Sequence, residues 1–276
     1  MKRIVGSVAI AALLAGCAAT SNATPGHSAA STASSGSNAG AIELTVYGAS
    51  SLKGALDAVK TAYATVAPSV TLTIATDASS TLRTQIEQGA PADAFLSADQ
   101  SNPKALVDGG LADGTDVDFA GNLLTVIVPA ANPAGIATPA DLAKAGTKVI
   151  AAGADVPITK YATQVVTKLA TQPGYPAGFV AAYDANVVSR EDNVKAVVAK
   201  IELGEGDAAI VYVTDAKASS KVTTIEIPAV ANVPATYAGL VVKASAHAAA
   251  AHAFLTWLAG PDGQKVLAGF GFLPPP

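Results

Sequence analysis

Short apolar stretches alternate with amphipathic ones along the chain from residue 42 onwards. In 70–75, Val, Leu and Ile alternate with Thr, as in a half-buried strand, whereas 51–67 carries its apolar residues at helical spacing. Further strands are predicted at 42–47, 94–97, 123–128, 148–152, 187–188 and 208–213. Further helices are predicted at 80–88, 104–108, 139–144, 157–171, 192–203, 246–258 and 261–268. This alternation is typical of an α/β fold.

Two apolar stretches divide this pattern into lobes. Leu123–Val128 ends at Pro129, and we interpret it as the first crossing between two lobes. The return crossing is expected within 225–242, which Pro228 and Pro234 interrupt. The prediction is therefore two α/β lobes, each a mixed, mostly parallel sheet flanked by helices. The predicted bounds are 41–122 with 236–276 for lobe 1 and 123–235 for lobe 2.

The N-terminal segment has the anatomy of an export signal. Lys2 and Arg3 precede the apolar stretch 4–15, which is too short to cross a membrane as a mature helix. Leu14-Ala15-Gly16-Cys17 then resembles the bacterial lipoprotein signal, in which the cysteine is lipidated after cleavage. The alternative is an ordinary signal peptide with a chance cysteine. We expect a signal peptide at 1–16, a lipidated Cys17 and a flexible linker over 17–40, so the exported protein is anchored to the cell membrane and faces the periplasm or the outer surface.

Charge and cysteine content narrow the candidate functions. Basic residues number 17 and acidic residues 21, for a formal net charge of −4. The chain has no dense basic run, so nucleic acid is not an expected partner. Cys17 is the single cysteine, so no internal disulfide forms and packing must supply the stability. A mildly acidic protein still binds anions where backbone and hydroxyl dipoles converge.

Small and hydroxyl-bearing residues recur where a predicted strand meets the next predicted helix. The segments are Gly48–Leu52, Asp77–Leu82, Val156–Ile158, Glu191–Val194 and Ile210–Asp215. In open α/β sheets, ligands bind outside the carboxyl ends of the strands, and helix N-termini present free N–H groups and a partial positive charge. Several such ends around one cleft form an anion site without lysine or arginine. Taken singly, each serine also fits a helix N-cap, and Tyr212 a half-buried core tyrosine with a satisfied hydroxyl.

Taken in order, these segments resemble the molybdate-binding proteins of bacterial importers over almost all of 42–272. The resemblance also rests on Gln85–Glu87, Gly89–Asp93, Ser97–Gln100 and Asp215-Ala216. The C-terminal pieces resemble solute-binding proteins more broadly: Ala253-Phe254, Leu258, Gly260-Pro261 and 263–272. The resemblance implies a two-lobed, type II periplasmic-binding-protein-like fold with its ligand in the interlobe cleft. It also implies that a monomer delivers molybdate, and tungstate, to the membrane permease of an ABC importer.

The resemblance further implies a ligand set. In that family, serine hydroxyls, backbone N–H groups and one tyrosine hold the anion. The matching positions here are Ser51, Ser79, Ile158, Val194 and Tyr212, with Ile158 and Val194 acting through their N–H groups. Molybdenum is then bound only as the oxyanion, and no cofactor is expected.

The chain departs from the family at two places near this set. The residues after Pro157 are bulkier than in the family and include Lys160, and Arg190 precedes the fourth segment. Whether Lys160 or Arg190 reaches the ligand stays open at this point.

Another oxyanion is the first alternative. Hydrogen phosphate carries a proton and needs a carboxylate acceptor, for which Asp77 and Asp192 are candidates, although acidic residues near helix starts commonly complement the helix dipole. Sulfate has no proton and accepts from neutral donors as molybdate does. Only the size of the pocket separates sulfate from molybdate.

A serine-dependent enzyme is a more remote alternative. Gly48–Leu52 resembles a nucleophile elbow, but the G-x-S-x-G pattern requires glycine where Leu52 stands. His247 and His252 lie five residues apart on one predicted helix, on different faces, and neither is placed to serve Ser51. No Cys/His cluster or H-E-x-x-H motif is present, so we expect a non-enzyme. A purely structural surface lipoprotein would not explain five donor-rich segments.

Overall fold

The computed structural model describes residues 40–276. The predicted signal peptide at 1–16, the lipidated Cys17 and the linker up to residue 39 lie outside the described residues.

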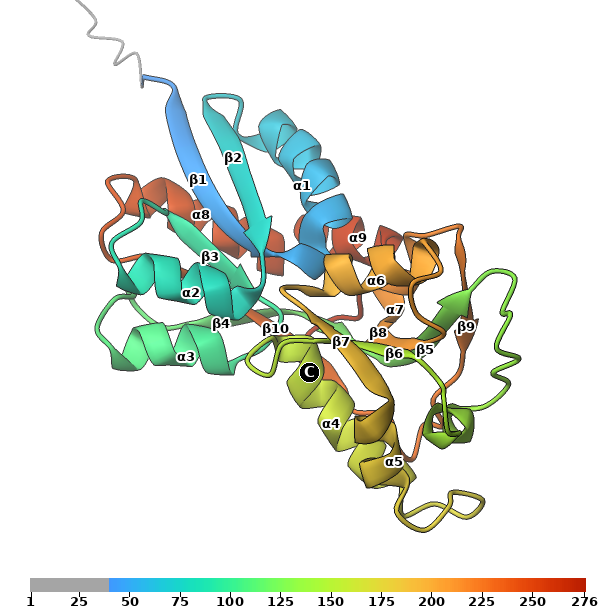
Figure 1. The fold of residues 1–276 in the computed structure, drawn as a ribbon. Helices are drawn as coiled ribbons and strands as arrows, with labels where there is room; N and C mark the ends of the chain where they lie inside the picture. The colour runs from blue at the N-terminus through green and yellow to red at the C-terminus, as the bar shows by residue number, and fades with distance from the viewer. Residues whose placement is uncertain (1–39) are drawn as a thin grey trace, which may run out of the picture. The chain divides into compact units, whose positions relative to one another are not determined.

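A five-stranded mixed sheet forms the first lobe (Figure 1). Its order is β2 (Val70–Asp77), β1 (Ile42–Ala49), β3 (Ala94–Ser97), β10 (Ala235–Val241) and β4 (Val117–Asn122). β1 pairs in parallel with β2 and β3, whereas β10 pairs antiparallel with β3 and β4. The sheet is mixed, as predicted, but its strands are parallel only among β1, β2 and β3. The reason is that β4 leaves this lobe and β10 returns to it, so the two lie side by side in opposite directions.

Helices cover both faces of this sheet. On one face, α1 (Lys53–Val66), α8 (Ala248–Ala259) and α9 (Pro261–Gly269) bury residues such as Leu56 and Phe254. On the other, α2 (Ser79–Glu87) and α3 (Ser101–Asp108) bury Leu82 and Leu106 against Phe95. Successive strand residues point to opposite faces of the sheet, and both faces carry apolar side chains. Each face therefore needs a covering layer of helices.

Two smaller sheets form the second lobe. One has the order β8 (Ala209–Tyr212), β5 (Leu124–Pro129) and β9 (Val222–Ile225), with antiparallel pairing throughout. The other joins β6 (Val149–Ala152) to β7 (Val187–Glu191) in parallel, and a bridge from Val149 to Ala208 links the two sheets. The helical elements of this lobe are η2 (Pro139–Ala143), α4 (Pro157–Leu169), α5 (Phe179–Asn186), α6 (Val194–Glu202) and α7 (Val213–Lys217).

The chain passes between the sheets twice. β4 ends at Asn122 and β5 begins at Leu124, so Leu123 alone separates a strand of one lobe from a strand of the other. The return runs through 226–234, between β9 and β10. The predicted α/β fold is confirmed, whereas the exact lobe bounds stay predictions. The mostly parallel sheet predicted for the second lobe is wrong for its three-stranded sheet, which is antiparallel.

Five described elements were not predicted from the sequence: β4, α5, α7, β9 and β10. In β4 the reason is composition, since Asp, Gly and Asn are depleted in strands and mask the pattern. The predicted helix at 192–203 begins at Val194 instead, because the side chain of Asn193 accepts a hydrogen bond from the N–H of Ala196 and caps the helix. Similarly, the predicted helix at 104–108 extends back to Ser101, because Pro103 lies in its first turn, where proline is tolerated.

Candidate functional site

The starts of four helical elements meet at one small cavity. They are η1 (Ser50–Leu52), α2, α4 and α6, two from each lobe. The cavity holds ≈ 190 Å³ of empty space, part of it open to solvent, of which ≈ 10 Å³ is accessible to the centre of a water molecule. It is lined by Ala49, Ser50, Ser51, Ala78, Ser79, Ala98, Val156, Pro157, Ile158, Val194 and Tyr212. All five residues predicted from the sequence are therefore brought together.

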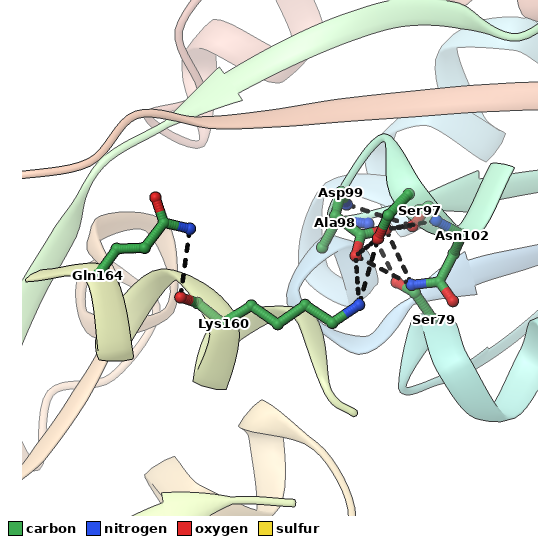
Figure 2. Close-up of polar contacts among 8 residues, drawn as sticks. Ser79, Ser97, Ala98, Asp99, Asn102, Lys160 and Gln164 are labelled. Atoms are coloured by element: carbon green, nitrogen blue, oxygen red, sulfur yellow. Dashed lines mark hydrogen bonds and ion pairs between the residues drawn. The ribbon is translucent and has the colours of Figure 1, made fainter. Parts of the chain in front are cut away.

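The two serines come from the first lobe, and neither is a helix cap. The N-cap positions of η1 and α2 are Ala49 and Ala78, and no side-chain cap is formed at either helix, so the N-cap interpretation of these serines was wrong. The Oγ of Ser51 lies 2.9 Å from the Oη of Tyr237. The Oγ of Ser79 accepts a hydrogen bond of 3.0 Å from the N–H of Ala98 (Figure 2).

The second lobe contributes backbone donors. Ile158 is the second residue of α4, after Pro157, and Val194 is the first residue of α6. The first N–H groups of a helix have no intrahelical acceptor, and within the described part of the chain neither of these two has a backbone acceptor. The helix dipoles add partial positive charge at the same two points. Two unused N–H donors thus face the serines across the cavity.

Tyr212 supplies a third hydroxyl, at the end of β8. Its side chain is 1 % exposed, and its Oη has no hydrogen-bond partner among residues 40–276. The interpretation of Tyr212 as a core tyrosine with a satisfied hydroxyl was therefore wrong. Burial, and next the neighbouring Tyr237 and Tyr161, raise the pKa of Tyr212 well above its usual value, so the group stays a neutral O–H donor. A buried donor without a partner costs about 1–3 kcal/mol, which an acceptor in the cavity would offset.

Among residues 40–276, no formally charged side chain lines the cavity. Lys160 points instead to the first lobe, where its Nζ lies 3.5 Å from Asp99 and 3.2 Å from Ser101 (Figure 2). Arg190 donates to the carbonyl of Ala152 at 3.3 Å. Neither Lys160 nor Arg190 is among the residues that line this cavity.

The two carboxylates considered for phosphate also stay outside. Asp77 accepts from the N–H of Ala78 at 2.7 Å and from the Nδ2 of Asn193 at 3.0 Å, and neither it nor Asp192 lines the cavity. The contact with Asn193 joins the two lobes, as the contact between Lys160 and Asp99 does.

The arrangement required for serine catalysis is not found in the described residues. The side-chain partner of Ser51 is a tyrosine, and His252 lies beside Asp113 at 3.0 Å on the exposed surface. In the range 40–276 no group of three or more His, Cys, Asp or Glu residues is placed to hold a metal ion. Over the same range no helix combines the length and the apolar character that a membrane span requires.

Sequence reasoning missed three residues that complete the site. Ala98 belongs to a recognised motif but was not assigned to the cavity, where it lies next to Ser79. Tyr237 and Asn122 support Ser51 from β10 and β4, with the Nδ2 of Asn122 3.3 Å from the Oη of Tyr237. Tyr237 lies 186 positions from Ser51 in the chain, so no local pattern links them.

Known proteins that resemble this chain over most of its length are bacterial binding proteins. The family described as bacterial extracellular solute-binding protein matches residues 44–273. The molybdate-binding protein ModA of Mycobacterium tuberculosis (strain ATCC 25618 / H37Rv) is 31% identical over 266 residues, which cover 96% of this chain and 95% of that protein.

Two solved structures share the fold. The periplasmic molybdate-binding protein of Azotobacter vinelandii aligns with a TM-score of 0.69 and 24% identity, covering 84% of this chain and 100% of that one. The sulfate-binding protein SubI of Mycobacterium tuberculosis H37Rv aligns with a TM-score of 0.74 and 22% identity, covering 84% and 87%. At such identities the likeness shows a common architecture, and the ligand must be argued from the cavity.

Proposed function

The chain belongs to the bacterial extracellular solute-binding proteins, and we propose that it captures molybdate outside the cytoplasm for an ABC importer. The observation that carries this proposal is the convergence of uncharged donors on one cavity. Ser51, Ser79 and Tyr212 offer hydroxyls, and Ile158 and Val194 offer N–H groups. Similarity to ModA over nearly the whole chain supports the same ligand.

The chemistry of the lining favours a fully deprotonated tetrahedral dianion. Every polar group proposed as a ligand is a donor, and burial keeps the hydroxyl of Tyr212 protonated. Hydrogen phosphate would bury an O–H without a carboxylate acceptor, because no carboxylate from the described part of the chain lines the cavity. An unmade buried hydrogen bond costs about 1–3 kcal/mol. Molybdate and tungstate satisfy all donors without a proton of their own.

Sulfate is the second candidate, since it also lacks a proton and the fold is shared with a sulfate-binding protein. Its S–O bonds are shorter than Mo–O or W–O bonds. A cage closed around the larger ions stretches its hydrogen bonds to sulfate, and longer hydrogen bonds are weaker. We therefore rank molybdate and tungstate first, sulfate next and phosphate last.

The remaining parts of the proposal follow from this role. The protein is a binding protein rather than an enzyme, needs no cofactor, and acts as a monomer that presents its closed form to the membrane permease. Cys17 carries the lipid that anchors it to the cell membrane.

Calorimetric titration of the purified protein with molybdate, tungstate, sulfate and phosphate tests the ligand. The expected result is tight one-to-one binding of the first two, weaker binding of sulfate and little or none of phosphate. Thermal unfolding gives a second readout, because a ligand at 100 times its Kd adds about 2.7 kcal/mol to the stability. Equal stabilisation by sulfate or phosphate at matched ionic strength would show that another anion is the ligand.

A further inference from the structure

Tyr237 supports the cavity without lining it. It lies in β10 with 0 % exposure, and its Oη is 2.9 Å from the Oγ of Ser51 and 3.3 Å from the Nδ2 of Asn122. We propose that Tyr237 is a positioning residue that fixes the hydroxyl proton of Ser51 in the direction of the bound anion. This inference rests on the proposed function, because it assigns a role toward the same oxyanion.

The direction of the protons follows from Asn122. Its Oδ1 accepts the N–H of Leu123 at 3.0 Å, and its Nδ2 donates to the Oγ1 of Thr214 at 2.8 Å. The N–H of Leu123 can only donate, so this contact identifies the oxygen of the amide, and the other amide atom, the nitrogen, faces Tyr237. An amide nitrogen only donates, so the Oη of Tyr237 accepts from Asn122 and must send its own proton elsewhere. Within the described residues its other hydrogen-bond partner is Ser51.

Ser51 therefore accepts from Tyr237 and keeps its own proton for the cavity. A serine hydroxyl has one proton and rotates freely, and an outward lone pair would repel an anion. Ser79 is held in the equivalent state by a different donor, the N–H of Ala98. In both serines a protein donor occupies the acceptor side of the oxygen, which leaves the O–H to donate. Hydrogen bonds in such a chain also polarise one another, which strengthens the last donor.

The chain of donors begins at the crossings between the lobes. Asn122 is the last residue of β4, and Thr214 lies in α7 of the second lobe. The amide of Asn122 thus contacts Thr214 of the second lobe and Tyr237 of the first at once. Burial raises the pKa of Tyr237 well above its usual value, so its O–H stays available as a donor.

A double-mutant cycle tests the inference. Tyr237→Phe removes the hydroxyl and keeps the ring, and should weaken molybdate binding about 3- to 12-fold, as expected for losing one hydrogen bond between uncharged groups. In the Ser51→Ala background the same change should alter affinity less than about 2-fold, because no proton remains to be directed. Tyr63→Phe is the matched control. Tyr63 is a buried tyrosine of α1 packed against Phe254, and removal of its hydroxyl should leave the affinity for molybdate unchanged.

The outcomes separate the possible errors. Unchanged affinity in Tyr237→Phe, or an equal loss with and without Ser51, overturns the positioning role and assigns Tyr237 to packing alone. If Tyr237→Phe does not fold, Asn122→Ala breaks the same chain one step earlier and must show the same dependence on Ser51. Failure of the wild-type protein to bind any of the four oxyanions would instead overturn the proposed function.

Discussion

Removing the hydroxyl of Tyr212 should move stability and affinity in opposite directions. In the structure this O–H is buried and unpartnered, so Tyr212→Phe removes a polar group that costs about 1–3 kcal/mol. In the absence of ligand the variant should therefore be more stable, by about 1 kcal/mol once partial hydration of an open form is allowed for. For a chain of this length that gain raises Tm by about 2–4 °C.

The same substitution should weaken molybdate binding. A hydrogen bond to a charged partner contributes about 1.5–3 kcal/mol, which corresponds to about a 10- to 150-fold rise in Kd. The assay is thermal or urea unfolding without ligand, combined with calorimetric titration of molybdate.

Ser79→Ala provides the contrast within the same cavity. The Oγ of Ser79 accepts from the N–H of Ala98, so its removal leaves that N–H unpaired and lowers stability by about 1 kcal/mol. Affinity should fall in this variant as well. The reasoning is refuted if Tyr212→Phe destabilises the unliganded protein and leaves affinity unchanged, since the hydroxyl would then have a protein partner.

Three further predictions address the anchor, the closure of the lobes and pH. Cys17→Ala should shift the protein from the membrane fraction to the soluble exported fraction, or leave it unprocessed, and normal processing with membrane fractionation would contradict lipidation. Lys160→Ala breaks the interlobe ion pair with Asp99, which is partly exposed and therefore screened by solvent. Molybdate should dissociate about 2- to 5-fold faster from this variant in a stopped-flow measurement. An unchanged dissociation rate would exclude a role of the ion pair in lobe closure. Burial raises the pKa values of Tyr212 and Tyr237 above their values in the unfolded chain, so ionisation of these two groups should leave the free energy of unfolding unchanged below about pH 10 and lower it at higher pH. Urea unfolding between about pH 6 and 11 measures this, and a decline beginning near neutrality would contradict it.

The proposed ligand residues could be predicted from the sequence because each lies in a short segment where a strand is followed by a helix. Ser51 and Ser79 each stand where a strand gives way to a helix, and that junction determines both the free N–H groups and the position at the sheet edge. The backbone donors at Ile158 and Val194 are equally local, since a proline is the first residue of α4 and an asparagine caps α6.

The residues that support the cavity could not be predicted from the sequence, because they meet their partners over long separations in the chain. Tyr237 meets Ser51 only because β10 is inserted between β3 and β4, and that strand order is a property of the whole sheet. Likewise, the true partner of Lys160 is Asp99 on the other lobe, 61 positions away, which no helical or strand period indicates. The strand at 117–122 was missed because its Asp, Gly and Asn obscure the pattern, although it leads directly into the first crossing.

The proposed use of the main-chain N–H groups of Ile158 and Val194 as donors has a consequence for mutational analysis. No side-chain replacement deletes an N–H group, except replacement by proline. An alanine scan of the cavity would therefore record losses at Ser51, Ser79 and Tyr212 and report almost nothing at the starts of α4 and α6. The side chains at 158 and 194 can change within packing limits while both N–H groups remain, so two of the five proposed donors depend on the course of the backbone rather than on residue identity.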